Sequence, residues 1–138
     1  MYIEKIRRYM KENNFINPQP PVELSMIAEA ESKLGVGFPD ELKKMLSEMN
    51  GDKWLLWSVE QIVDDNMQIR EYLADCYEGI NELLFIAGNG CGDYYAYSIQ
   101  NGQILTTEMI IWEHEDNSKT FVAHSLLEMI DRYYNSEI

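Results

Sequence analysis

The stretch that decides the fold reads Leu83-Leu-Phe-Ile-Ala-Gly-Asn-Gly-Cys-Gly-Asp-Tyr-Tyr-Ala-Tyr97. An uncharged apolar run opens it, three glycines follow within five residues, and an aromatic alternation with a period of two completes it. That period is typical of a strand with one buried face. Two strands joined by a glycine-rich turn predict the central pair of an antiparallel sheet.

The glycines of this stretch could also suggest a phosphate-binding turn. Such a turn opens a helix whose N-terminal amides hold the anion, whereas this one leads into a strand. We therefore interpret Gly88, Gly90, Gly92 and Asp93 as a structural turn. We expect Gly92 to adopt a positive φ or to let another backbone approach closely. Asp93 should accept hydrogen bonds from nearby backbone amides, with exposure to solvent as the alternative.

The flanking segments predict helices before and after this sheet. We expect helices at residues 2–13, 22–34, 39–49 and 58–76, short strand material at 53–57, and a further strand within 104–112. A polar loop at 113–119 should lead to a closing helix with Phe121, Val122, Leu126, Ile130 and Tyr133 in its core face. The order predicts one α+β domain over residues 1–138, with a mostly antiparallel sheet, N-terminal helices, one intervening helix and a closing helix.

Composition predicts a globular chain without a membrane span. Its 138 residues are 46% hydrophobic and 12% aromatic, enough for a substantial core. No apolar run approaches the ~18 residues of a membrane span, and the charged N-terminus lacks the core of a signal peptide. We expect Cys76 and Cys91 to be free, mostly buried thiols in a reducing cytoplasm, although one bridge is the alternative.

The charge is unevenly distributed. The net charge is −13, and residues 58–116 contain twelve acidic residues and a single basic one, Arg70. Binding nucleic acid requires a basic footprint, so nucleic acid is not an expected direct ligand. The acidity suits either a generally soluble surface or a negative field that steers a basic partner.

Chemistry-bearing patterns are weak. The run Glu113-His114-Glu115-Asp116 has ligand-type side chains, but four consecutive residues cannot converge on one ion. Ser125 beside His124 lacks the Gly-x-Ser-x-Gly pattern of a hydrolase. A carboxylate near Cys91 would raise the thiol pKa rather than activate it. We therefore predict no enzymatic activity, no metal and no cofactor.

The acidic middle of the chain is the predicted partner-binding surface. Its carboxylates should form one continuous negative surface, with Trp112 as an apolar anchor. Trp54 and Trp57 should point to opposite faces, so that one of them is partly exposed. The predicted contact residues are Glu60, Asp64, Asp65, Glu71, Asp75, Trp112, Glu113, Glu115 and Asp116.

Four segments resemble one family in the same order. The segment Glu31-x-x-Leu-Gly-x-x-Phe-Pro-x-x-Leu-x-x-x-Leu-x-x-x-Asn-Gly51 resembles the opening signature of the SUKH superfamily. Residues 57–62 are similar to its strand-to-helix step, residues 85–93 resemble its central motif, and residues 112–115 and 125–127 are similar to its closing elements. The resemblance covers about residues 22–134 and leaves out the N-terminal helix expected at 2–13.

The superfamily contains fungal Smi–Knr-type cell-wall regulators and many bacterial immunity proteins. The resemblance therefore implies a non-enzymatic α+β binding protein. The function it favours is a cytoplasmic immunity protein that neutralises a cognate protein toxin, for example a basic nuclease domain, by direct contact. The alternative is a regulatory or scaffold module that binds a host protein. Neither function involves nucleic acid or a membrane directly.

Overall fold

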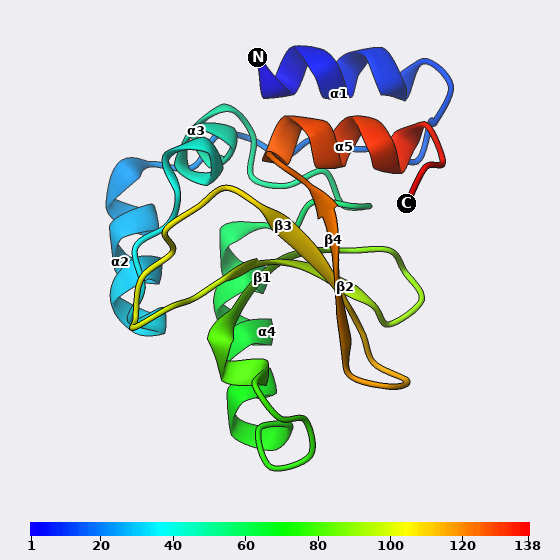
Figure 1. Cartoon of the computed structure of the whole chain (residues 1–138). Coiled ribbons are helices and arrows are strands. Elements are labelled where there is room, and N and C mark those ends of the chain that lie inside the picture. The colour runs from blue at the N-terminus through cyan, green and yellow to red at the C-terminus, as the bar shows by residue number, and fades with distance from the viewer.

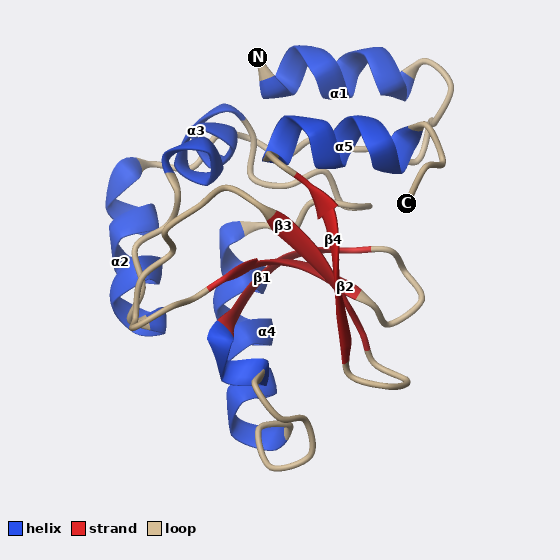
Figure 2. Ribbon diagram, in the orientation of Figure 1, coloured by secondary structure: helices blue, strands red, loops and turns tan.

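Four strands form an antiparallel meander, and the computed structural model describes all residues from 1 to 138. The strand order is β1-β2-β3-β4, and every neighbouring pair is antiparallel. Figure 1 and Figure 2 show helices on both sides of this sheet, which confirms the predicted α+β class. The strands are β1 (Leu83–Gly88), β2 (Tyr94–Ser98), β3 (Met109–Glu113) and β4 (Ser118–Ala123).

Five α-helices accompany the sheet, and two of their predicted ends are confirmed. Gly35 ends the second helix at φ 67°, and the Ser58 hydroxyl accepts a hydrogen bond from Gln61 N at 3.1 Å to cap the fourth. None of the helices combines the length and apolarity needed to cross a membrane. They are α1 (Tyr2–Met10), α2 (Leu24–Leu34), α3 (Asp40–Glu48), α4 (Val59–Tyr72) and α5 (Leu126–Tyr134), and a 3-10 turn, Ile80–Glu82, precedes β1.

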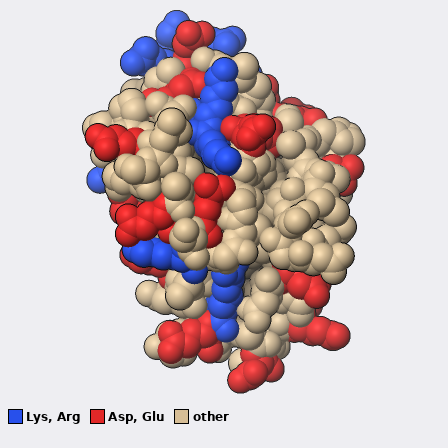
Figure 3. Space-filling view, turned by 90° about the vertical axis from the view of Figure 1, so that its left-hand side faces the viewer, with Lys and Arg blue, Asp and Glu red and all other residues tan.

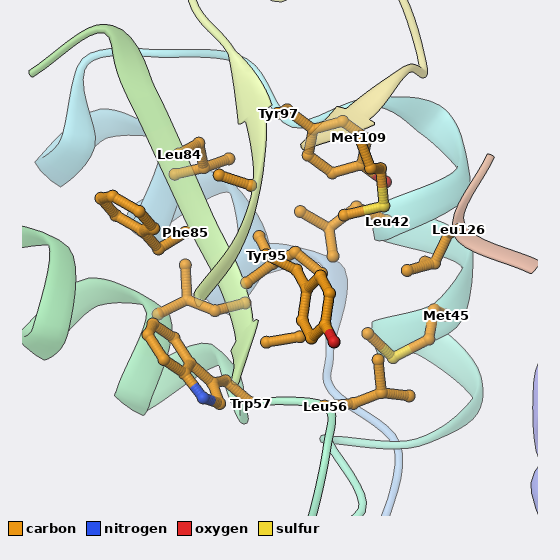
Figure 4. Packing of buried hydrophobic residues seen from close by; sticks show 14 of the residues in the cluster. Leu42, Met45, Leu56, Trp57, Leu84, Phe85, Tyr95, Tyr97, Met109 and Leu126 are labelled. Carbon is orange, nitrogen blue, oxygen red and sulfur yellow. The ribbon is translucent and has the colours of Figure 1, made fainter. Parts of the chain in front are cut away.

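The two faces of the sheet bury different aromatic residues. Tyr95 and Tyr97 point toward α3, while Phe85 and Trp57 lie on the side of α4 (Figure 4). The Tyr97 hydroxyl donates to Glu41 Oε1 of α3 at 3.0 Å. The same carboxylate accepts from Leu126 N at the start of α5 at 3.1–3.2 Å. Glu41 thereby joins a strand and two helices.

Helix α1 forms an outer layer on α5 (Figure 1). Its Lys5 ammonium contacts both carboxylate oxygens of Asp131 in α5, at 2.9 and 2.8 Å. The Tyr9 hydroxyl donates to the same carboxylate at 2.5 Å, and its ring stacks on Tyr134 with centroids 4.9 Å apart. Buried Ile6 belongs to the one cluster of 35 buried residues that forms the core.

Several predicted boundaries are wrong. Residues 53–57 form no strand but a turn with one isolated bridge, Leu56 to Ala87. The intervening helix ends at Tyr72 rather than Cys76, and the third strand begins at Met109 rather than near 104. The predicted central pair of strands is also wrong in one member. Strand β1 lies at the edge of the sheet, and β2 and β3 form its centre.

The fourth strand was not predicted. Residues 118–123 pair with β3, so Phe121 and Val122 belong to β4 rather than to the closing helix. Phe121 is 45% exposed and is therefore not a core residue, whereas Val122 is buried. The two cysteines, Cys76 and Cys91, are free as expected, but both are exposed rather than buried.

A buried asparagine joins α4 to the edge strand. Asn66 is 1% exposed. Its side-chain amide donates to Phe85 O at 2.8 Å and to Ile62 O at 2.7 Å, and its side-chain oxygen accepts from Phe85 N at 2.9 Å. Asn66 therefore provides the hydrogen bonds to the backbone N–H and C=O of Phe85 that a neighbouring strand would otherwise provide.

Replacing this asparagine should destabilise the fold. In Asn66→Ala, both backbone groups of Phe85 lose their buried partners, and we expect the free energy of unfolding to fall by about 2–4 kcal/mol. Urea unfolding measures the loss. The matched control is Gln68→Ala, two residues along on the exposed side of α4, which should change it by less than about 0.5 kcal/mol. Equal losses would contradict the assigned role.

Candidate partner-binding surface

Residues 89–93 form a compact turn between β1 and β2, which we call the glycine turn. Asn89 N donates to Asp93 O at 3.2 Å, and the Asn89 side chain accepts from Cys91 N at 2.8 Å. Gly90 and Gly92 adopt φ of 80° and 91°, values that side chains rarely allow. The positive φ expected at Gly92 is therefore present, and the turn is closed by its own backbone.

Gly88 does not belong to this turn. It is the buried last residue of β1. A Cβ atom there would lie 3.3 Å from Tyr94 Cδ1 and 3.4 Å from Trp57 Nε1. The rings of Trp57 and Tyr94 meet edge to face at 5.0 Å, so Gly88 serves the close packing of two aromatic rings on the strand.

Asp93 joins the glycine turn to the next hairpin. Its Oδ1 accepts a hydrogen bond from His114 N at 3.1 Å and lies 2.8 Å from His114 Nδ1. Burial acts to raise the pKa of Asp93, but the hydrogen bonds from His114 and Asn89 outweigh it and hold the pKa below its usual range. Acceptance from a backbone amide agrees with the expectation for Asp93.

The last residue of β3, Glu113, and the next three residues, which begin the β3–β4 connection, are called here the acidic turn (residues 113–116). Glu113, Glu115 and Asp116 are all exposed. The turn is closed by Asn117 N donating to Glu113 O at 2.9 Å, with Asn117 at φ 60°. Asp116 Oδ1 accepts from Ser118 N at 2.9 Å. Three carboxylates are therefore presented on a backbone of defined conformation.

The acidic turn is anchored to the segment that follows α4. The backbone oxygen of Glu78 accepts hydrogen bonds from Asn117 Nδ2 at 3.0 Å and from Lys119 Nζ at 2.9 Å. Asp75, three residues before Glu78, is exposed in the same segment. The segment that carries Asp75 and the hairpin that carries the acidic turn are therefore distant in the sequence but joined in the structure.

The remaining predicted acids are spread along α4. Asp65 lies beside Tyr94, whose pKa is raised first by burial and then by the Asp65 charge. Glu60 and Asp64 line a pocket with Lys33 of α2. On the face that carries α2, basic side chains lie between acidic ones (Figure 3). Cations on the α2 side therefore partly offset the negative charge of the α4 acids. The remaining acid of this helix, Glu71, is exposed.

Trp112 is not available as a surface anchor, which corrects the prediction for this residue. It is 2% exposed. Its ring contacts Phe85, Tyr94 and Tyr77 with centroids 5.2–5.8 Å apart. Its Nε1 donates to Asn117 Oδ1 at 2.7 Å. The buried Trp112 is therefore bonded to the residue that directly follows the acidic turn.

The exposed tryptophan is Trp54 instead. It is 50% exposed, whereas Trp57 is 6% exposed, in line with the expectation that one of the two is partly exposed. Phe15 and Tyr133 lie against Trp54. Phe15 stands in a linker without periodicity, so no sequence signal marks it as an exposed neighbour of Trp54. Tyr133, which is predicted in the core face of the closing helix, is half-buried.

Ligand-type side chains do not gather into a metal-binding group. No group of three or more His, Cys, Asp or Glu side chains is placed to hold a metal ion. Gly92 separates Cys91 from Asp93, and the exposed Cys91 thiol makes no hydrogen bond with His114. The Asp93–His114 pair therefore links two turns, which suits a binding surface.

The contact between Gly92 and His114 can be separated from backbone strain. A Cβ atom at Gly92 would lie 3.0 Å from His114 Cε1, whereas one at Gly90 would meet nothing within 4 Å. Both substitutions to alanine strain a positive-φ position, at about 1 kcal/mol. We expect Gly92→Ala to lower the free energy of unfolding by about 1 kcal/mol more than Gly90→Ala. Equal losses in urea unfolding would assign the whole effect to the backbone.

The lowered pKa of Asp93 predicts a pH-dependent contribution to stability. Because the folded-state pKa is below the unfolded one, the stabilisation is present above the unfolded pKa of about 3.9 and is lost as pH falls toward the folded value. The difference in unfolding free energy between the native chain and Asp93→Asn should therefore be larger at pH 5 than at pH 3. A difference equal at both pH values would contradict this.

Comparison with known proteins gives one clear result. The family model SUKH_6, described as SMI1-KNR4 cell-wall, matches residues 24–130. No curated protein matches the chain. The matched region begins at the first residue of α2 and ends within α5, so it contains the whole sheet, the glycine turn and the acidic turn. The chain belongs to the SUKH_6 family of SMI1-KNR4 cell-wall domains, within the SUKH superfamily.

Proposed function

We propose that this protein is a cytoplasmic immunity protein that neutralises a cognate protein toxin by direct binding. SUKH proteins are in general non-enzymatic immunity or regulatory proteins, and a role in protein–protein contact fits that family. The observation that carries the proposal is the acidic turn. Its Glu113, Glu115 and Asp116 are exposed on a closed turn, within a segment that has twelve acids and one base.

The charge suggests the kind of toxin. A toxin that acts on nucleic acid must present a basic cleft for the phosphate backbone. A negative protein surface can occupy such a cleft and exclude the substrate. Electrostatic steering of this kind raises association rates by ~10 to 10³-fold and weakens as salt screens the field. A basic nuclease domain is therefore the toxin class that we propose.

The acidic turn is the centre of the proposed surface, and other carboxylates extend it. Asp75 lies in the segment against which the acidic turn is held, and Asp65 lies beside Tyr94 on β2. Lys33 lies close to Glu60 and Asp64 and offsets their charge locally. We therefore assign Glu60, Asp64 and Glu71 of α4 to the long-range negative field rather than to direct contact. Rim charges such as these affect association more than final affinity.

Co-expression in a sensitive host tests the function. The chain is produced together with the toxic domain of a candidate toxin, chosen as a large secreted protein whose gene adjoins its own, and growth is compared with the toxic domain alone. An immunity protein restores growth and co-purifies with the toxin as a defined complex. Failure to protect, together with isolation of a constitutive host protein as the partner, would favour the regulatory or scaffold function instead.

The acidic turn should control how fast the complex forms. We expect the joint variant Glu113→Lys, Glu115→Lys, Asp116→Asn to slow association by about 10-fold at low ionic strength and to reduce its salt dependence. Asparagine at 116 keeps an oxygen for Ser118 N, so the unfolding midpoint should change little. Stopped-flow mixing at low and high salt measures the rates.

A matched variant separates local from global charge. Glu4→Lys, Glu12→Lys, Glu23→Gln makes the same change in net charge at exposed residues of the N-terminal part. It should slow association much less than the acidic-turn variant. Equal slowing by both variants would assign steering to net charge alone and would move the contact away from the acidic turn.

A further inference from the structure

Three aromatic side chains from separate segments form a group at the surface, which we call the aromatic cluster: the exposed Phe15 and Trp54 and the half-buried Tyr133. Phe15 and Trp54 are 45% and 50% exposed. Their ring centroids are 4.2 Å apart with the planes inclined by 42°. Trp54 Nε1 donates to the Tyr133 hydroxyl at 2.9 Å. The indole is thus held in one orientation while half of its surface faces solvent.

The loop below Trp54 is held by a buried carboxylate. Asp52 is fully buried, and its Oδ1 accepts from the backbone N–H of Trp54, Leu55 and Leu56 at 2.8–2.9 Å. Its Oδ2 accepts from the Tyr134 hydroxyl at 2.8 Å. The backbone at Trp54 is therefore held by a satisfied polar network, while Phe15 and Tyr133 orient its ring.

Lys53 adds a backbone outlier at the same place. Its φ is 61°, which is uncommon for a residue with a long side chain. The turn around Asp52 accommodates this backbone angle, and the same turn leaves the large ring of Trp54 exposed at the surface. Packing of Phe15 and Tyr133 accounts for the buried half of the Trp54 ring but not for the half that remains exposed.

A cleft adjoins the exposed indole. It has a volume of about 420 Å³, and Lys53 is the only charged side chain among its lining residues. Its other polar groups are neutral, with the amides of Gln19, Asn50 and Gln61 prominent. No carboxylate lines this cleft, although the protein has a net charge of −13 and the lining residue Asn50 donates through Nδ2 to Glu60 Oε2 at 2.9 Å. Lys53 disfavours a cation on the indole, so an uncharged apolar group suits this position.

The aromatic cluster is continuous with the acidic surface. The Tyr133 ring meets the ring of Tyr95 edge to face, with centroids 6.4 Å apart, and Tyr95 follows the glycine turn by two residues. Gly92 in the glycine turn lies against the His114 ring of the acidic turn. The end of α5 and the β1–β2 and β3–β4 turns follow one another along one side of the molecule (Figure 1).

We propose that the aromatic cluster anchors an aliphatic side chain of a partner protein whose basic residues face the acidic turn. This inference rests on the proposed function and names the contact that supplies affinity. A rigid, partly exposed tryptophan is the kind of residue that dominates binding energy, because it buries a large area with little loss of side-chain entropy. The acidic turn supplies the complementary charge.

Two short peptides test the anchor without the toxin. Acetyl-Lys-Lys-Leu-Lys-Lys-amide and its serine counterpart carry the same charge and differ only in the central side chain. Each is titrated into the full chain labelled with ¹⁵N at the tryptophan indoles. We expect the leucine peptide to shift the Trp54 signal, to leave those of buried Trp57 and Trp112 in place, and to bind at least about threefold more tightly than the serine peptide.

Variants identify the side chain responsible. Trp54→Ala should remove the preference for leucine while weak binding of both peptides at the acidic turn remains. Phe121→Ala removes an equally exposed ring from β4 and should keep the preference. Unfolding midpoints of both variants check that the fold is intact. Equal affinity of the native chain for both peptides, or an unmoved Trp54 signal, would overturn the anchor.

Three further outcomes separate this inference from its alternatives. Concentration-dependent shifts of the Trp54 signal without peptide would show a second copy of the chain as the occupant and would overturn the proposal. Full protection by Trp54→Ala at unchanged toxin affinity would refute the anchor while the immunity function stands. A leucine preference at Trp54 in a chain that protects against no toxin would support the anchor and refute the immunity function.

Discussion

The outer edge of β1 is the constraint on which the rest of this structure depends. All six residues of β1 are buried, yet the strand has a sheet neighbour on one side only. Its outward backbone groups therefore need partners from the protein. Asn66 bonds both polar groups of Phe85, and Trp57 N donates to Ile86 O at 3.0 Å. Gly88 N completes the edge by donating to Leu55 O at 3.1 Å.

Closing that edge determines where the exposed aromatic ring lies. The segment Leu55–Trp57 can run along β1 only if the chain turns sharply just before it. Asp52 makes the turn by accepting three successive N–H groups, and Lys53 takes up the unusual backbone angle. As a result Trp57 packs under Gly88 while Trp54 is left at the surface. The scaffold and the proposed anchor are two consequences of one requirement for hydrogen bonds.

The predictable parts of the fold are those with a local signal. The caps at Ser58 and Gly35 and the turn at Gly90 and Gly92 were recognised because short-range backbone chemistry specifies them. The strand β4 was missed because an edge strand with a polar start lacks regular alternation. Buried Asn66 has no local signal either, since an asparagine in a helix is most often exposed. Its partner lies 19 residues away and is defined only by the folded chain.

The candidate surface divides in the same way. Charge is a property of composition, so the acidic middle of the chain can be found by counting residues. The position of the α2 cations that offset it cannot be found in this way. The sequence also cannot distinguish Trp112 from Trp54 as the exposed residue, because both are tryptophans near charged residues and only tertiary packing buries one of them. Long-range attraction tolerates such imprecision in position, whereas an apolar anchor does not. A surface that combines rim charges with an apolar anchor can change its charges while the anchoring ring stays in place. The charges then set the association rate, and the anchor sets which partner stays bound.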